Sequence, residues 1–395
     1  MSTWVRPLAE GWVVRDEIPG PDVDEFATAD QVRAALATVG PDTLLAVQHP
    51  HRTPAAVASG LDLASALPTA RSALDRLRAT AYRKVTDVVA PYEVDGPDGT
   101  AVGVLCLVDP AAVGADGLAR VRHSEQVYPD VVAERAAVLT ALGCATSAAL
   151  LVPVSRGASL TAVVRRAITR LGPPVVETVD SAGRRHRMWL LGPGPDQDEV
   201  LAVAGAQPLL VADGNHRVAA AAAAGLGGML ALVTGGPDLR IGAIHRVLTG
   251  TGLGAQDLAD RWSRAGLDVQ FPTSAEPPKD PGRVVVWTHQ GALSVELPTP
   301  EPDAPTPRID HAVVERVLLA EALGLDLSGP QVRPLPDPQL DSGMPDGADA
   351  VVLLAPVPYA DVLAVHRQHR IMPRKATYFT PKPRSGLLLA ELAAR

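Results

Sequence analysis

The chain has 395 residues, of which 47% are hydrophobic and 20% charged, a composition typical of a folded globular protein. A chain of this length is expected to form two or three subdomains. Its 36 basic and 44 acidic side chains leave a formal charge of −8, which argues against nucleic acid as the main partner. The N-terminal residues lack a secretory signal and no segment is apolar enough to span a membrane, so we expect a cytoplasmic protein without a membrane partner.

The first segment, residues 1–114, reads as an N-terminal α/β subdomain. The pattern predicts a helix from residue 23 to Gly40, an apolar strand over 43–50 and helical periodicity over 54–83. A strand pair follows, with Asp98-Gly99 as its hairpin signal. Cys106 and Cys144 match no zinc or redox spacing, so we expect two buried free thiols.

The second segment, residues 115–250, alternates helices and strands. We expect helices over 130–143, 159–172 and 216–225, strands over 148–154, 208–213 and 228–235, and a hairpin within 180–191. The third segment, 251–395, begins with proline-rich linkers in 273–308 around one strand. A helix over 310–325, a strand over 349–357, a helix over 359–370 and a basic closing segment complete a mixed α/β protein.

A polar turn separates the apolar strand that ends near residue 212 from an alanine-rich helix. It consists of Asp213, Gly214, Asn215, His216 and Arg217. Gly214 permits a positive φ, Asp213 or Asn215 can cap the helix, and the first amides favour an anion together with His216 and Arg217. A simple helix cap explains fewer of these residues, so the turn predicts a phosphate site.

The turn resembles the DGHHR box of the ParB/sulfiredoxin-like superfamily and of its free serine kinases. A wider resemblance covers nearly the whole chain, to a bacterial family of unknown function with the motifs HExT, DGHHR, a strand ending in HRV, and MPxKSTYFxPKxxSGL. The matching blocks here are Glu125 with Arg135, residues 213–217, residues 244–247, and MPRKATYFTPKPRSGL from Met372. The resemblance implies a ParB/sulfiredoxin-like nucleotide-binding core, at 115–250, flanked by N- and C-terminal α/β segments.

Four positions depart from the family motifs. Ser124 stands where the family has His, Val127 where it has Thr, Asn215 where it has the first His of the box, and Ala376 where it has Ser. The family's N-terminal PPYD-like segment is not visible either. These differences keep open the alternative that the chain binds a nucleotide as a regulatory or scaffold protein with altered catalysis.

The resemblance also implies roles for single residues. Glu125 would be the general base that takes a proton from a substrate hydroxyl, the alternative being a solvated acid at a helix start. Asp213 would help to bind Mg²⁺, and Arg135 would contact a phosphate or an acidic partner. In the closing segment, basic residues surround Thr377 and suit a phosphate or carboxylate substrate: Arg374, Lys375 and Lys382.

His245 and Arg246 follow Ile244 in the HRV block and are candidates for the same substrate, although a buried histidine with a hydrogen bond is the simpler role for His245. The chain has no P-loop, GxGxxG, GxSxG or HExxH motif. The leading hypothesis is therefore a kinase that uses ATP or ADP with Mg²⁺ to phosphorylate a small hydroxyl metabolite such as free serine. A homodimer is compatible with the sequence, and a ParB-like DNA-associated protein or nuclease is disfavoured by the charge.

Overall fold

The computed structural model describes residues 4–23, 26, 29–299, 307–340 and 343–392. Parts of two expectations, the helix start at 23–28 and the linkers within 273–308, therefore lie outside the described residues. Two compact units emerge: unit 1 is Met1–His123, Val127–Leu239 and Pro381–Arg395, and unit 2 is Ser124–Gln126 and Arg240–Thr380. These bounds differ from the three segments expected from the sequence, because the C-terminal residues pack with the N-terminal part of the chain.

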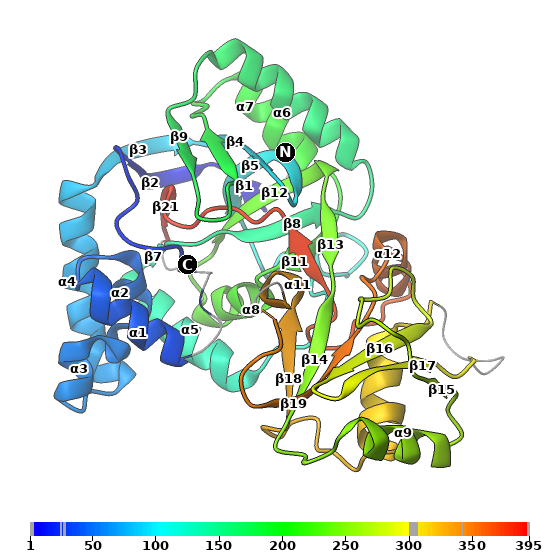
Figure 1. Cartoon of the computed structure of the whole chain (residues 1–395). Helices are drawn as coiled ribbons and strands as arrows, with labels where there is room; N and C mark the ends of the chain where they lie inside the picture. The colour runs from blue at the N-terminus through cyan, green and yellow to red at the C-terminus, as the bar shows by residue number, and fades with distance from the viewer. Residues whose placement is uncertain (1–3, 24–25, 27–28, 300–306, 341–342, 393–395) are drawn as a thin grey trace. The chain divides into compact units, whose positions relative to one another are not determined.

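The main sheet of unit 1 mixes parallel and antiparallel pairs, in the order β6-β11-β8-β12-β5-β4-β10-β9, and β1 pairs with β5 (Figure 1). Its strands are β1 (Val5–Arg6), β4 (Ala90–Gly96), β5 (Gly99–Val108), β6 (Val121–Arg122), β8 (Ala149–Pro153), β9 (Val176–Val179), β10 (Arg185–Met188), β11 (Leu209–Asp213) and β12 (Met229–Asp238). The expected hairpin at Asp98-Gly99 is confirmed, since β4 and β5 pair up to Gly96 and Gly99.

A smaller sheet in unit 1 joins the two ends of the chain. Its order is β3-β2-β21-β7, with β2 (Leu8–Val14), β3 (Tyr82–Val88), β7 (Cys144–Ala145) and β21 (Leu388–Glu391). The C-terminal strand β21, red in Figure 1, lies beside the N-terminal strand β2, dark blue. The part of the closing segment from Pro381 onward thus belongs to the fold of unit 1.

The helices of unit 1 are α1 (Ala29–Val39), α2 (Leu44–Gln48), η1 (Pro50–Arg52), α3 (Pro54–Ala58), α4 (Leu63–Thr80), α5 (Pro129–Leu142), α6 (Gly157–Leu171), α7 (Pro195–Ala204) and α8 (Asn215–Ala224). The strand expected at 43–50 is wrong, because Leu44–Gln48 is helical. Thr43 caps this helix by accepting a hydrogen bond from the amide of Ala46. A short buried apolar run fits either a strand or a helix, and the cap decides between them.

The core of unit 1 lies between the main sheet and its helices. Val104 of β5, Leu151 of β8 and Val164 of α6 are all fully buried in it. Both cysteines are buried free thiols, as the sequence predicts. Burial raises the pKa of the Cys106 thiol to about 12 and that of Cys144 to about 11.

Unit 2 contains a six-stranded sheet, in the order β15-β17-β16-β19-β14-β18, and a β13-β20 ladder within its described residues. The strands are β13 (Arg240–Gly242), β14 (Ile244–Thr249), β15 (Val269–Gln270), β16 (Arg283–Thr288), β17 (Gly291–Glu296), β18 (Val332–Pro336), β19 (Ala348–Leu353) and β20 (Tyr378–Thr380). The helices are α9 (Ala255–Arg264), α10 (Asp310–Val313), the π-helix η2 (Val314–Glu321), α11 (Asp337–Leu340) and α12 (Tyr359–Arg367).

Two helices bury one face of the unit 2 sheet. Trp262 of α9 is fully buried, and its indole N–H donates to the carbonyl of Leu318 in η2 at 3.1 Å. Leu293 and Val352 of the sheet belong to the same core. Among the described residues, no helix combines the length and the apolar character needed to cross a membrane.

The close approach of α6 to β12 gives a test of the packing in unit 1. A Cβ atom at Gly235 would lie 2.2 Å from the carbonyl oxygen of Gly157, and backbone cannot move aside as a flexible side chain does. We expect Gly235→Ala to lower the free energy of unfolding by about 1–3 kcal/mol, as overpacking does. Urea unfolding measures this loss.

Gly192→Ala is the matched control for that measurement. A Cβ at Gly192 meets no atom within 4 Å, and its φ lies outside the left-handed range. This variant should unfold like the wild type. Equal stability of the two variants would contradict the proposed contact.

Candidate functional site

The turn between β11 and α8 has the conformation that its glycine predicts. Gly214 is the N-cap of α8 and has a φ of 93°, in the left-handed region. A Cβ there would lie 2.7 Å from Nε of Arg217 and 3.3 Å from Cα of Ala149. Gly214 occupies the N-cap position of α8, where the sequence predicts Asp213 or Asn215. The carboxylate of Asp213 contacts side chains from two parts of the chain.

Two cations hold that carboxylate. Lys382 donates from Nζ to Oδ1 of Asp213 at 2.6 Å, and Arg217 donates from Nη2 to Oδ2. The side chains of Asp213, Arg217 and Lys382 are only 23%, 16% and 24% exposed. The basic closing segment thus contributes Lys382 to the turn, 169 residues away in the sequence.

Two serines extend this group. Arg217 donates from Nη1 to the hydroxyl of Ser147, and the hydroxyl of Ser385 donates to the same oxygen at 2.9 Å. We call these five residues the Asp213 cluster: Asp213, Arg217, Lys382, Ser147 and Ser385. It combines two cations, one carboxylate and two hydroxyls beside the N-terminus of α8, an environment that favours an oxyanion.

Asn215 and His216 contact residues of unit 1 that lie just before α5 in the sequence. Oδ1 of the buried Asn215 lies 3.1 Å from Nδ1 of His123, whose pKa burial lowers. The amide of Tyr128 donates to Nε2 of His216 at 3.0 Å, and the two rings stack. A nitrogen that accepts this N–H carries no proton, so His216 supplies no positive charge in this arrangement. These contacts brace the turn.

Glu125 is held by the closing segment within unit 2. Its Oε2 accepts a hydrogen bond from the amide of Lys375 at 2.7 Å. Glu125 and Met372 form a parallel β-bridge, and the amide of Met372 donates to the carbonyl of Ser124 at 2.8 Å. Glu125 is therefore a half-buried residue whose carboxylate is positioned by a hydrogen bond.

His245 and Arg246 lie inside β14 and are buried, at 0% and 3% exposure. Nδ1 of His245 accepts from the amide of Leu354 at 3.1 Å, and its Nε2 lies 2.9 Å from Oδ1 of Asp337. This is the simpler role that the sequence favoured for His245. Arg246 pairs with Glu315 and with main-chain carbonyls, which leaves its guanidinium poorly placed for a phosphate.

The remaining predicted residues lie in both units. Arg135 is exposed on α5, Lys375 is exposed, and Arg374 and Thr377 are half-buried in unit 2. Their roles remain predictions. Sequence reasoning missed Ser147, for which no motif gives a signal, whereas Ser385 stands in the matched C-terminal block.

The described residues do not fit a magnesium site built by the protein. No three His, Cys, Asp or Glu side chains among them gather to hold a metal. Both oxygens of Asp213 contact cations, which repel a divalent ion. Lys382 and Arg217 already supply positive charge there, so we derive no step through Mg²⁺.

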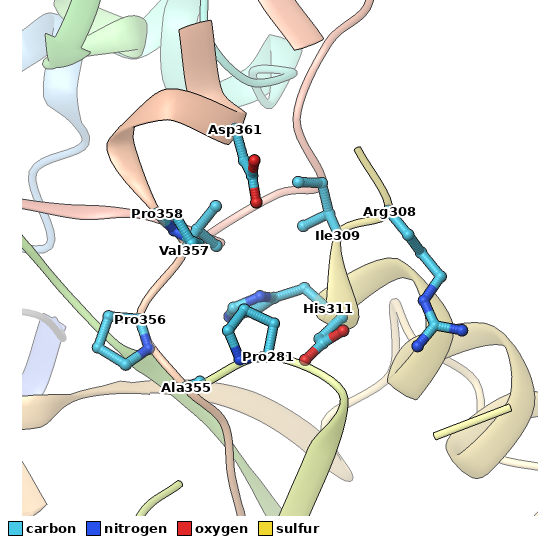
Figure 2. A pocket seen from close by; sticks show the side chains of 10 residues that line it. Pro281, Arg308, Ile309, His311, Ala355, Pro356, Val357, Pro358 and Asp361 are labelled. Atoms are coloured by element: carbon cyan, nitrogen blue, oxygen red, sulfur yellow. The ribbon is translucent and has the colours of Figure 1, made fainter. Parts of the chain in front are cut away.

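Unit 2 also has a small hollow that is open to solvent. Figure 2 shows Asp361, Val357, Pro281 and His311 around it. His311 is fully buried and its Nε2 lies 2.9 Å from the carbonyl oxygen of Ile244. The hollow includes none of the predicted site residues, and we assign no ligand to it.

The buried His311 makes a prediction about acid stability. Burial, and then the charge of Arg246, lower its pKa from 6.5 to about 3. Between these two pKa values, His311 binds a proton in the unfolded chain but not in the folded chain. Burial of the neutral His311 therefore leaves the free energy of unfolding unaffected above pH 6.5 and lowers it as the pH falls. From pH 7.5 to 4.5 the wild type should lose about 2–3 kcal/mol that His311→Gln retains.

Urea unfolding of both proteins at the two pH values measures the difference. The comparison at each pH cancels the contributions of other groups, including Asp310, whose pKa burial raises. Parallel losses in the two proteins would contradict the role of His311.

Comparisons with known proteins assign the chain to a family. Similar solved structures include free serine kinase in complex with AMP (TM-score 0.40, 13% identity, 70% of this chain and 89% of that chain). Others are a mutant free serine kinase in complex with ADP (0.39, 12%, 70% and 89%) and C-terminally truncated SbnI from Staphylococcus aureus (0.40, 13%, 72% and 87%). A comparison with curated proteins finds no match. The model of the family described as "Protein of unknown function (DUF1015)" matches residues 31–315, and the chain belongs to this family.

Proposed function

We propose that the protein is a small-molecule kinase with a ParB/sulfiredoxin-like core, which transfers a phosphoryl group from ATP or ADP to a hydroxyl metabolite such as free serine. The observation that carries the proposal is the Asp213 cluster, in which Lys382 and Arg217 share one carboxylate beside the N-terminus of α8. Its side chains have a formal charge of +1 in a protein of charge −8. An added phosphate oxygen would meet two charge-assisted donors there.

Each residue of the cluster has a part in this proposal. Phosphoryl transfer depends on positioning and on neutralising charge around the transferred group. Lys382 and Arg217 would neutralise phosphate oxygens, while Asp213 keeps both cations at the turn. The hydroxyls of Ser147 and Ser385 add neutral donors, and Gly214 lets the phosphate approach the backbone.

Glu125 would act on the acceptor. As the acceptor oxygen forms its bond to phosphorus and the bond to the leaving nucleotide breaks, the hydroxyl proton passes to the Glu125 carboxylate. Glu125 follows His123 by two residues, and His123 contacts Asn215 of the turn. The proposal requires Glu125 and the Asp213 cluster to act on the same substrates, which variants at the two places test.

One observation favours a second candidate, a nucleotide-binding regulatory protein without turnover. Asn215, which stands where relatives have a histidine, is buried and faces His123. If catalysis needs a charged group at that position, the cluster would bind a nucleotide and transfer nothing. Nucleotide binding without product would support this candidate over the kinase.

The first test separates binding from chemistry. The protein is incubated with ATP or ADP, magnesium chloride and a pool of hydroxyl amino acids, and products are read by ³¹P NMR and mass spectrometry. Glu125→Gln should lower kcat about 10²–10⁴-fold, because the general base is lost, while calorimetry gives an unchanged nucleotide Kd. Wild-type kcat in this variant would rule out Glu125 as the base.

The second test removes one cation. Lys382→Met loses a charge-assisted bond worth about 1.5–3 kcal/mol, so the nucleotide Kd should rise about 10–100-fold by calorimetry. Lys279→Met is the matched control, because Lys279 is exposed in unit 2 and should leave the Kd unchanged. Equal affinities of the two variants would place nucleotide binding elsewhere.

A further inference from the structure

The guanidinium of Arg246 donates all of its hydrogen bonds to groups within unit 2. Nε and Nη2 donate to Oε1 of Glu315 at 2.9 and 2.7 Å, and Nη2 also donates to the carbonyl of Arg374 at 3.0 Å. Nη1 donates to the carbonyl of Lys375 at 3.1 Å and reaches those of Ile244 and His245 at 3.3 and 3.2 Å. These acceptors account for the five N–H groups of an arginine.

The carbonyl of Arg374 and the amide of Lys375 belong to one peptide unit. A trans peptide is planar, and its C=O and N–H point in opposite directions. Arg246 holds the oxygen of this unit, and Oε2 of Glu125 accepts from its N–H at 2.7 Å. The direction of the hydrogen bond to Glu125 therefore depends directly on where Arg246 holds the carbonyl.

The backbone at this point needs such support. Lys375 has a φ of 49°, in the left-handed region, which costs a residue with a Cβ about 1–2 kcal/mol. Arg246 binds the carbonyls on both sides of this φ, those of Arg374 and Lys375. The buried ion pair with Glu315 in turn fixes the guanidinium, whose side chain is 3% exposed.

We propose that Arg246 is a positioning residue, which orients the Glu125 carboxylate through the Arg374–Lys375 peptide. This inference rests on the proposed function for the role of Glu125 as a general base. The hydrogen bonds that link Arg246 to Glu125 through the peptide do not depend on that function. In this role Arg246 would act through the peptide and would touch neither the nucleotide nor the acceptor. A buried charge pair that stabilises little on balance is consistent with a role in placement.

The experiment compares Arg246→Lys with the wild type. Lysine keeps the charge opposite Glu315 but has one nitrogen, so it cannot hold both carbonyls and the carboxylate in the planar geometry of arginine. We expect kcat to fall about 10–100-fold with the nucleotide Kd unchanged, because the base is misplaced while the Asp213 cluster is intact. The acidic limb of the kcat profile should move to higher pH, since Glu125 loses a donor that favours its charged form.

A kcat and pH profile equal to those of the wild type would overturn the proposal, and so would a Kd that rises in parallel with the loss of kcat. Arg333→Lys is the matched control, because Arg333 is exposed on the neighbouring strand β18. It should behave as the wild type. If Arg246→Lys does not fold, Glu315→Gln loosens the guanidinium while leaving its carbonyl bonds, and the same shift of the acidic limb is expected.

Amide hydrogen exchange of the full chain separates this inference from the proposed function. The Lys375 amide should be protected in the wild type and should exchange faster in Arg246→Lys and in Glu125→Ala. If no phosphorylated product forms but this pattern holds, the kinase proposal fails and the positioning link stands. Unchanged protection in Arg246→Lys overturns the link whatever the activity.

Discussion

The ion pair between Asp213 and Lys382 is the interaction on which the Asp213 cluster depends, because it ties the closing segment to a turn 169 residues earlier. Residues that follow Lys382 in this segment also contact other parts of unit 1. The amide of Arg384 donates to the buried Tyr92 hydroxyl at 3.0 Å, and its guanidinium lies 3.1 Å from Asp22. Strand β21 then pairs with both β2 and β7. The C-terminal residues therefore complete the sheet and the Asp213 cluster at once, and neither is expected to form without them.

The same pair also explains why the cluster favours an anion. A carboxylate between two cations is partly removed from water, and such groups stabilise a fold only when their geometry is satisfied. Asp213 pairs with one cation through each oxygen, and the five side chains of the cluster together carry a formal charge of +1. The N-terminal end of the α8 dipole adds to it. An oxyanion would balance this excess, whereas a metal ion would increase it, so the chemistry of the cluster fits a phosphate better than a magnesium ion.

Local signals allowed much of the fold to be predicted, and long-range contacts account for what was missed. Asp98-Gly99 and Gly214 fix their turns through backbone geometry that one or two residues determine. The run after Thr43 was misread because its burial fits two periodicities. Ser147 and the partners of Arg246 could not be predicted, since they are defined by segments that meet only after folding. The turn was thus predictable from the sequence, while the side chains around it and the peptide that holds Glu125 were not.

Three of the residues that depart from the family motifs are buried. Ser124 and Asn215 are each 5% exposed and Ala376 is fully buried, so all three substitutions lie in packed surroundings. Asn215 contacts His123, and Ser124 contacts Met372 through its carbonyl. The cations proposed to bind phosphate, Lys382 and Arg217, are held by Asp213 and Ser147. Loss of the family residues at these positions therefore changes how the turn and the Glu125 segment are packed. It leaves the charge of the Asp213 cluster unchanged.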